Sequence, residues 1–374
     1  MLRIAHIFSG NDTGGAMTHV VTLLKALRNE CQVTLIVINE GLIADEIRTL
    51  NIPVHVIEPN GFKIISEMPK LAKYCNENFD LVHSHGTRAN LLAGLLHAFY
   101  KVKTLSTTHS DYLLEYDKSP RGLTLRGVNQ WCYKSIPYHI AISQKMCSTM
   151  IERGVKKQAV FAASNGLDLE RYAVTLTKDA FLKQYELTIK PNDKIIGIVA
   201  RIHPVKGLNQ FIISAIAVCQ KRPDVLFIIA GGGDPQLKKE LLSLIQNASL
   251  EKRIRFLGRL SNIANFYNAI DINVLTSLNE TFPYVLMEGG YFGKPAISSR
   301  VGGVGELIDD GETGLLFESG DTLALSQKMI SLLENETLSA ELGAKLKALV
   351  LEKHTSQIMA ARHIAIYREI LKQN

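Results

Sequence analysis

Short apolar runs alternate along the chain with longer segments in which apolar residues recur at helical spacing. The first apolar run covers residues 4–8 and leads through a glycine-rich loop into a segment where apolar side chains recur every three or four positions from Met17 to Leu27. Further strand-like runs follow at residues 33–38, 54–57, 81–84 and 103–106. Strands that alternate with helices predict parallel pairing with right-handed crossovers.

The same alternation restarts after Asn165 and a polar stretch at residues 174–194. Its strand-like runs cover residues 195–200, 225–230, 254–257, 272–275 and 296–298, and a helix-prone tail begins at about residue 339. The pattern predicts two Rossmann-like doubly wound parallel-sheet domains. We place them at residues 1–170 and 171–355, with a C-terminal helix at about 356–374 that can pack back on the first. Ligands bind beyond the carboxyl ends of such strands, so we expect the domains to face a central cleft.

Length and composition fit two globular domains. The 374 residues are 46% hydrophobic and 21% charged. Arg3 and His6 interrupt the first apolar run, so the N-terminus lacks the apolar core of a signal peptide, and no apolar run reaches the roughly 18 residues of a spanning helix. We expect a cytoplasmic protein. Its five cysteines, without CxxC spacing, indicate reduced structural thiols rather than disulfides or a metal site.

The net charge of +6 lies mainly in the first half of the chain. Residues 101–157 contain ten basic and four acidic side chains, together with Tyr112, Tyr116, Trp131 and Tyr133. A basic and aromatic surface fits the anionic inner face of a membrane, where each Lys or Arg contributes about 1 kcal/mol. An ordinary solvated face explains this charge about as well. No nucleic-acid-binding motif accompanies it, so we expect no nucleic-acid partner.

Two glutamates flank the start of a predicted helix in the second domain. Pro283 suits the first helical turn, because its missing N–H costs nothing there. Glu280 then lies in the loop before the helix, and Glu288 lies inside it. The unpaired N–H groups of a helix N-terminus bind phosphate, and the two carboxylates can accept hydrogen bonds from hydroxyls of a sugar and a ribose. The pattern suits a nucleotide-sugar site, although any single Glu in such a place is commonly an ordinary helix-terminal or solvated carboxylate, and the neighbouring segments decide between the two.

Two basic residues, Arg201 and Lys206, follow the first strand of the second domain. A guanidinium grips phosphate with two hydrogen bonds, and an ammonium adds a point charge to the same anion. We expect both side chains to be exposed. Taken alone, such a pair is more typical of exposed basic residues in a solvated loop.

The first domain offers a glycine pair and alternating histidines at strand ends. Gly14 and Gly15 lack side chains, so backbone N–H groups there can approach a ligand, although the pair does not complete a GxGxxG fingerprint. His83 and His85 have no nearby Cys or acidic residue to complete a zinc site. We expect no metal and assign both histidines a structural or acceptor-side role.

Taken together, these segments resemble the retaining group 1 glycosyltransferases of family 4, which have the GT-B fold. The signature of that family is an E-x7-E pair followed by GxP, a GG turn and a DGxxGLL run. Glu280 and Glu288 match the pair at its full spacing, and residues 293–295, 302–303 and 310–316 match the rest. The resemblance covers nearly the whole chain.

The resemblance implies roles for individual residues. Residues 201–207 resemble an R-x4-KG motif that binds the donor diphosphate, and the segment ending at Ser110 resembles T-x-H-D, in which His109 contacts the donor sugar near the reacting carbon. Ser110 replaces the usual Asp, which leaves the control of the His109 tautomer open. The implied catalytic residues are His109, Glu280, Arg201 and Lys206. The implied donor-binding residues are Gly14, Gly15, Arg201, Lys206, Gly231, Leu257, Gly258, Glu280, Thr281, Phe282, Pro283, Tyr284, Val285 and Glu288.

The reaction implied by the resemblance is attack of an acceptor hydroxyl on the anomeric carbon of a nucleotide sugar, with retention of configuration and without a bound metal or further cofactor. We expect a UDP-linked hexose or N-acetylhexosamine as donor. The expected acceptor is a glycan or a lipid-linked precursor of a cell-surface polysaccharide, reached from the inner face of the membrane. The alternatives are a sugar-nucleotide epimerase or a phosphorylase of similar shape, or an inactive nucleotide-sugar-binding protein. A phosphorylase would need a cofactor-lysine signature that the sequence lacks.

Overall fold

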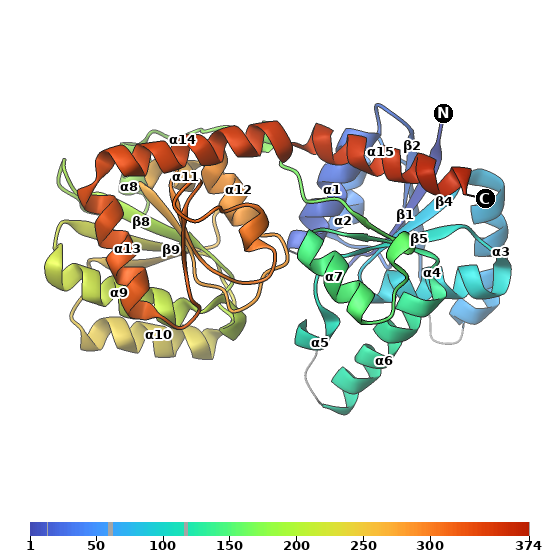
Figure 1. Ribbon diagram of the computed structural model, residues 1–374, viewed down its shortest axis with the longest axis horizontal. Coiled ribbons are helices and arrows are strands. Elements are labelled where there is room, and N and C mark those ends of the chain that lie inside the picture. Colours follow the sequence, from blue (N-terminus) through green and yellow to red (C-terminus); the bar gives the residue numbers. More distant parts are fainter. Residues whose placement is uncertain (13, 59–62, 116–118, 374) are drawn as a thin grey trace. The chain divides into compact units, whose positions relative to one another are not determined.

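The chain divides into two compact α/β units, each built on one parallel sheet (Figure 1). One unit comprises Met1–Gly166 and Thr355–Asn374, and the other comprises Leu167–His354. The two parallel-sheet units confirm the predicted fold class. The computed structural model describes residues 1–12, 14–58, 63–115 and 119–373.

The first unit contains a seven-stranded sheet in its described residues, in the order β3-β2-β1-β4-β5-β6-β7, with every pair parallel. The order reverses between β1 and β4, which places the loops after these two strands at a switch point. The strands are β1 Arg3–Ser9, β2 Gln32–Ile38, β3 Val54–Ile57, β4 Leu81–His85, β5 Thr104–Thr108, β6 Tyr138–Ala141 and β7 Val160–Ala162.

Helices cover both faces of this sheet. The α1 helix and the C-terminal helix α15 pack against each other on one face, and α3 and α4 cover the other. The helices are α1 Gly15–Leu27, α2 Leu42–Thr49, α3 Lys63–Asn78, α4 Thr87–Tyr100, α5 Tyr112–Glu115, α6 Pro120–Ser135, α7 Gln144–Glu152 and α15 Ser356–Lys372, with a 3-10 turn at Lys157–Ala159.

Alternating side chains of β1 show why its sequence is an apolar run. Ile4 and Phe8 belong to the core that includes α1 and α15, whereas Ala5 and Ile7 belong to the core that includes α3 and α4. A strand buried on both faces needs apolar residues at every position. His6 interrupts this run on the α1 and α15 face, fully buried.

The second unit contains a six-stranded parallel sheet in the order β10-β9-β8-β11-β12-β13, which reverses between β8 and β11. The strands are β8 Lys194–Val199, β9 Val225–Ala230, β10 Ile254–Gly258, β11 Ile272–Leu275, β12 Ala296–Ser299 and β13 Leu315–Phe317. The helices are α8 Lys178–Gln184, α9 Leu208–Lys221, α10 Pro235–Asn247, α11 Ile263–Ala269, α12 Tyr284–Tyr291, α13 Thr322–Glu334 and α14 Glu336–Lys353, with 3-10 turns η2 Leu169–Tyr172, η3 Pro204–Lys206 and η4 Val304–Glu306.

Two details differ from the sequence-based expectations. Helix α12 begins at Tyr284, so Pro283 is its N-cap with extended backbone and not its first helical residue. The short strands β6, β7 and β13 were not predicted. Among the described residues, none of the helices has the length and apolar character that crossing a bilayer requires.

Candidate functional site

The loops after β8 and β11 meet at the switch point of the second sheet, where ligands bind in open α/β folds. They bring two of the predicted site residues into contact. The ammonium Nζ of Lys206 lies 2.5 Å from Oε1 of Glu280, and Ser277 Oγ donates a hydrogen bond to the same oxygen at 2.7 Å. Both contacts use Oε1, and no described residue donates a hydrogen bond to Oε2.

Backbone hydrogen bonds join these two loops. Lys206 ends the η3 turn, and its carbonyl oxygen accepts a hydrogen bond from Thr276 Oγ1 at 3.0 Å. The N–H of Leu278 donates to the carbonyl oxygen of Val205 at 2.7 Å. The Lys206 and Glu280 side chains therefore approach each other from loops that already hold each other in place.

The GG turn at Gly302 and Gly303 packs on the Glu280 loop. The N–H of Gly303 donates to the carbonyl oxygen of Glu280 at 3.2 Å. Gly302 has φ of +51°, and a Cβ there would lie 1.5 Å from that same oxygen. Only glycine fits at this position, for reasons of both conformation and space.

The two basic residues differ in their surroundings. The Lys206 side chain is 20% exposed and its partner Glu280 is 13% exposed. The expectation that Lys206 is exposed was therefore wrong, because the ion pair with Glu280 draws the ammonium into the loop contact. Arg201 is exposed as expected, and it forms no hydrogen bond or ion pair within the described part of the chain. The structure joins Lys206 to Glu280 and, among the residues it describes, shows no partner for the Arg201 guanidinium.

Glu288 lies in α12, and two phenols orient its carboxylate. Oε1 accepts a hydrogen bond from Tyr172 at 2.8 Å, and Oε2 accepts one from Tyr267 at 2.7 Å. Burial raises the pKa of Glu288, and the two hydrogen bonds act in the opposite direction. Sequence reasoning missed both tyrosines, because no motif links residues 116 and 21 positions away from Glu288.

The side chains of the residues that lead into α12 are buried or partly buried. Phe282 and Pro283 are buried, and the Phe282 ring packs on His354 with ring centres 5.1 Å apart. Thr281, Tyr284 and Val285 are partly buried. A ligand at this helix start would therefore meet N–H groups of the first turn, which is the feature that binds phosphate.

Three of the implied donor-binding residues, Gly231, Leu257 and Gly258, also lie together. The N–H of Gly231 donates to the carbonyl oxygen of Gly258 at 2.7 Å, across the ends of β9 and β10. The β10 strand shifts register between Phe256 and Gly258, so Leu257 sits in the irregular end of the strand. A Cβ at Gly231 would lie 1.9 Å from the carbonyl oxygen of Ala200, and its φ of +136° is rarely adopted by other residues, so space and conformation both explain this glycine.

In the first unit, the loops after β1 and β4 lie at the switch point. Gly14 is the N-cap of α1 with φ of +85°, and Gly15 begins that helix. A Cβ at Gly14 would meet nothing within 4 Å, so its conformation rather than crowding requires glycine. Thr13, the residue before this pair, lies outside the described residues. Gly86, after β4, is likewise a positive-φ N-cap.

His109 follows β5 and belongs to a cluster of histidines that the sequence did not reveal. His85 Nδ1 lies 3.3 Å from His109 Nε2, and His85 Nε2 lies 3.0 Å from His6 Nδ1. Ring nitrogens within 4.8 Å of one another form two groups in the described residues, His6 with His83 and His85, and His19 with His85 and His109. Neutral imidazoles can bind metal ions. The sequence analysis looked for a third ligand close to His83 and His85 in the sequence, whereas the neighbouring histidines come from distant segments.

Burial keeps these imidazoles neutral. It lowers the pKa of His6 to about 3 and of His19 to about 4. It also lowers the pKa of His83, His85 and His109 well below the ordinary range, and neighbouring histidines add to the effect. Each ring therefore carries one N–H and one bare nitrogen at physiological pH.

The basic segment 101–157 is less aromatic at its surface than expected. Tyr112 and Tyr133 are buried, with ring centres 5.4 Å apart. That part of the expectation was wrong, because both rings belong to an apolar core rather than to the surface. Trp131 is 37% exposed. Residues 116–118, including Tyr116, lie outside the described residues.

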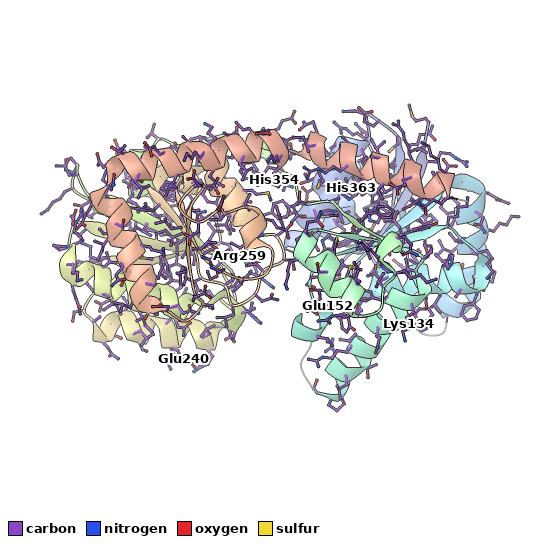
Figure 2. All side chains as sticks on the ribbon, viewed as in Figure 1. Lys134, Glu152, Glu240, Arg259, His354 and His363 are labelled. Carbon is purple, nitrogen blue, oxygen red and sulfur yellow. The ribbon has the colours of Figure 1, made fainter. Side chains whose placement is uncertain are left out.

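One stretch of α6 does combine exposed basic and apolar side chains. Leu123 is 54% exposed, and Arg121 is exposed two residues before it. Lys134, labelled in Figure 2, is also exposed near the end of the same helix.

Comparison with known proteins agrees with this geometry. The family model described as Glycosyltransferase Family 4 matches residues 13–171, and the one described as Glycosyl transferases group 1 matches residues 181–348. The N-acetyl-alpha-D-glucosaminyl L-malate synthase of Bacillus anthracis is 27% identical over 321 residues, which cover 84% of this chain and 81% of that protein.

A second relative is the UDP-Gal:alpha-D-GlcNAc-diphosphoundecaprenol alpha-1,3-galactosyltransferase of Escherichia coli. It is 25% identical over 314 residues, which cover 79% of this chain and 77% of that protein. Among solved structures, Anabaena HepE in complex with UDP-glucose matches with a TM-score of 0.85 and 21% identity, covering 100% of both chains. The chain belongs to the group 1 glycosyltransferases of family 4 and is a glycosyltransferase with the GT-B fold.

Proposed function

We propose that this glycosyltransferase moves a hexose or N-acetylhexosamine from a UDP-linked donor to a hydroxyl of a lipid-linked or cell-surface polysaccharide precursor, with retention of configuration. The observation that carries the proposal is the contact between Lys206 and Glu280 at the switch point of the second sheet. It combines a cation suited to a diphosphate with a carboxylate suited to sugar hydroxyls. The Escherichia coli relative supports these donor and acceptor classes, since its name gives UDP-Gal as donor and a diphosphoundecaprenol acceptor.

The donor site would be assembled from parts of the second unit. Lys206 and Arg201 would neutralise the diphosphate, together with the N–H groups at the start of α12. Glu280 can accept a sugar hydroxyl at Oε2, because its Oε1 is already taken by Lys206 and Ser277. Glu288, held by its two phenols, would accept a ribose hydroxyl, and the backbone at Leu257 and Gly258 would contact the base.

Catalysis would come mainly from stabilising the departing diphosphate. The acceptor oxygen bonds to the anomeric carbon while the bond from that carbon to the phosphate oxygen breaks, so negative charge builds up on the leaving group. The departing phosphate oxygen can then take up the proton of the acceptor hydroxyl. Fixed cations and helix N–H groups stabilise that charge more than they stabilise the intact donor. His109 takes the role that the resemblance implies, contact with the donor sugar near its reacting carbon. The residues named here require no resident metal ion for these steps.

We also propose that the protein works in the cytoplasm at the inner face of the membrane. Exposed Leu123 and the exposed basic residues Arg121 and Lys134 on α6 support this location. The diphosphoundecaprenol acceptor of the Escherichia coli relative has a lipid chain, which favours the same location.

Replacing Lys206 tests the donor site. We expect UDP to raise the melting temperature of the wild type, by mass action, and Lys206→Ala to lose most of this shift. Turnover of UDP-glucose or UDP-N-acetylglucosamine should fall on the order of 10²- to 10³-fold, the usual effect of removing one charge-stabilising group. Glu280→Gln should lower transfer more than it lowers UDP binding. Differential scanning fluorimetry and a UDP-release assay measure both effects.

A matched control is Lys239→Ala, which removes an exposed lysine from α10. It should leave UDP binding and turnover unchanged. Wild-type turnover in folded Lys206→Ala would reject the diphosphate role. UDP release that needs an acceptor supports a transferase, whereas a changed sugar nucleotide without UDP release would identify an epimerase. UDP binding without turnover over a panel of donors and lipid-linked acceptors would indicate an inactive binding protein.

A further inference from the structure

Three imidazoles in the first unit form a hydrogen-bonded line that ends at His109. His6 and His85 lie nearly parallel, with an interplanar angle of 11°, ring centres 5.3 Å apart and nitrogens 3.0 Å apart. His85 and His109 have an interplanar angle of 30°, ring centres 5.5 Å apart and nitrogens 3.3 Å apart. These values fit hydrogen bonds directed from ring edge to ring edge rather than stacked faces.

The sheet brings the three residues together. His6 of β1 pairs in register with His83 of β4, and His85 lies two residues further on the same face. His85 in turn pairs with Thr107 of β5, and His109 lies two residues after Thr107, directly after the end of that strand. Alternation along neighbouring strands therefore directs these histidines to the face covered by α1 and α15.

Because the rings are neutral, the line couples their tautomers. His85 uses Nε2 toward His6 and Nδ1 toward His109, and only one of these nitrogens carries a proton. If His85 donates to one neighbour, it must accept from the other. Fixing the proton on any ring therefore fixes it on all three.

The buried end of the line favours one of the two arrangements. His6 Nε2 is buried without a hydrogen-bond partner among the described residues. A buried N–H without a partner is rarer than an unpaired acceptor, so His6 Nε2 should be the bare nitrogen. His6 then donates from Nδ1 to His85, and His85 donates from Nδ1 to His109. His109 accepts at Nε2 and carries its own proton on Nδ1.

We propose that His85, supported by His6, is a positioning residue that fixes the tautomer and orientation of His109. The inference rests on the proposed role of His109 at the donor sugar. The family pattern has Asp after this histidine, but this chain has Ser110, whose hydroxyl carries no charge. The line of imidazoles supplies a directional hydrogen bond to His109 from the neighbouring strands β4 and β1, on the same face of the sheet.

A metal site is the competing interpretation of the same cluster. One cation cannot bind the line as it stands, because His85 directs different nitrogens toward its two neighbours. A cation held by His19, His85 and His109 would have to replace the hydrogen bond between His85 and His109, and one held by His6, His83 and His85 would have to replace the hydrogen bond between His6 and His85. The two interpretations therefore predict different states of the nitrogens His85 Nδ1 and His109 Nε2.

Nitrogen-15 NMR of histidine side chains reads the tautomers directly. In the wild type we expect His109 as a single neutral tautomer protonated on Nδ1. In His85→Leu the spectrum should show a mixture or the other tautomer. In His85→Asn the side-chain amide lies near the former Nδ1, can donate to His109 Nε2, and should restore the wild-type pattern. The matched control is His139→Leu, which removes a buried histidine that contacts Ser106 and not the line.

Kinetics then test whether the tautomer matters. With UDP-glucose or UDP-N-acetylglucosamine, whichever is turned over, His85→Leu should lower kcat about tenfold or more while KM stays within about twofold, because the substrate contacts remain. His85→Asn should recover most of kcat. His139→Leu should keep the kcat of the wild type.

The outcomes separate this inference from the proposed function. An unchanged His109 tautomer in folded His85→Leu would overturn the inference whatever the rates are. A changed tautomer with wild-type kcat would overturn the positioning role, and His109→Gln with wild-type kcat would show that the proposed role of His109 itself had failed. Stoichiometric zinc in the purified protein, or activity lost to a chelator and restored by zinc, would overturn the line in favour of a metal site.

Discussion

Glu280 is held through both its side chain and its backbone. Its carboxylate contacts Lys206 and Ser277, and its carbonyl oxygen accepts the N–H of Gly303. Gly302 touches the same carbonyl from a backbone conformation that side chains rarely adopt. Gly302, which is not part of the charged pair, therefore helps to fix the position of Glu280 and of its ion pair with Lys206.

Gly302→Ala should displace the Glu280 loop. The left-handed conformation alone costs roughly 1–2 kcal/mol for alanine, and the added Cβ would lie 1.5 Å from the Glu280 carbonyl oxygen, so one loop must move. We expect a lower melting temperature and a loss of turnover comparable with that of Lys206→Ala. Scanning fluorimetry and the UDP-release assay measure the two effects.

Gly305→Ala is the matched control in the same segment. A Cβ at Gly305 would meet nothing within 4 Å, and Gly305 is not among the glycines with positive φ. The control should keep both stability and turnover. If Gly302→Ala behaves like the control, the fit of the GG turn against Glu280 does not position the pair.

At the level of single residues, the sequence could indicate charged groups but not their neutral partners. Glu280 and Glu288 stand out by their spacing along one segment. Tyr172 and Tyr267, which orient Glu288, come from distant segments and belong to no motif. The ion pair of Lys206 could not be predicted, because it depends on a contact between two loops whose residues lie 74 positions apart in the sequence. Lys206 was therefore expected to be exposed.

At the level of elements, long apolar runs were recognised and short strands were not. The β6 strand reads Tyr138–Ala141 and includes a buried histidine, and β7 and β13 have three residues each. Such short segments have too few positions to show a period. The register of His6 with His83 was also out of reach, because a shift by one residue would turn the histidines to the other face.

The α6 helix is the element that the membrane proposal depends on. We expect the protein to bind phosphatidylglycerol vesicles and to bind phosphatidylcholine vesicles only weakly. High salt should release it from the phosphatidylglycerol vesicles, because ions screen the exposed charges of Arg121 and Lys134. Leu123→Asp should weaken binding about tenfold or more, since inserting a leucine contributes about 1.5–3 kcal/mol. Vesicle sedimentation measures the bound fraction.

The same substitution at Leu323 is the matched control. Leu323 is 67% exposed on α13 of the second unit, so Leu323→Asp introduces the same charge at a site at least as accessible as Leu123. The control should bind vesicles like the wild type. Equal losses in both variants, or equal binding to neutral and anionic vesicles, would contradict a specific role for α6.

At the scale of the whole molecule, histidine is distributed unevenly between the two units. Nine of the 11 histidines belong to the first unit, and the second contains only His203 and His354. Burial lowers the pKa of His6 and His363 to about 3 and of His139 to about 4. In the second unit, burial shifts a pKa in the other direction: it raises the pKa of the Glu288 carboxyl.

These shifts predict that acid weakens the first unit. A histidine whose folded pKa lies below its unfolded value of about 6.5 binds protons better in the unfolded chain. Its contribution to stability is complete above pH 6.5 and is lost as the pH falls toward the folded pKa. Each such histidine can remove up to about 1.4 kcal/mol per pH unit between pH 6.5 and 5. The raised pKa of Glu288 has the opposite sign, since its cost to the second unit disappears as the pH falls.

The single tryptophan makes the first unit separately observable. Trp131 lies on α6 and packs against Gly94 of α4, where a Cβ would come within 2.7 Å of its ring. Urea unfolding followed by its fluorescence should give a midpoint that falls from pH 7 to pH 6 and falls further at pH 5. In His139→Leu the fall should be shallower, because one of the proton-binding groups is gone. A midpoint independent of pH over this interval would mean that the buried histidines are not held neutral, and the coupled tautomers of His6, His85 and His109 would then lose their physical basis.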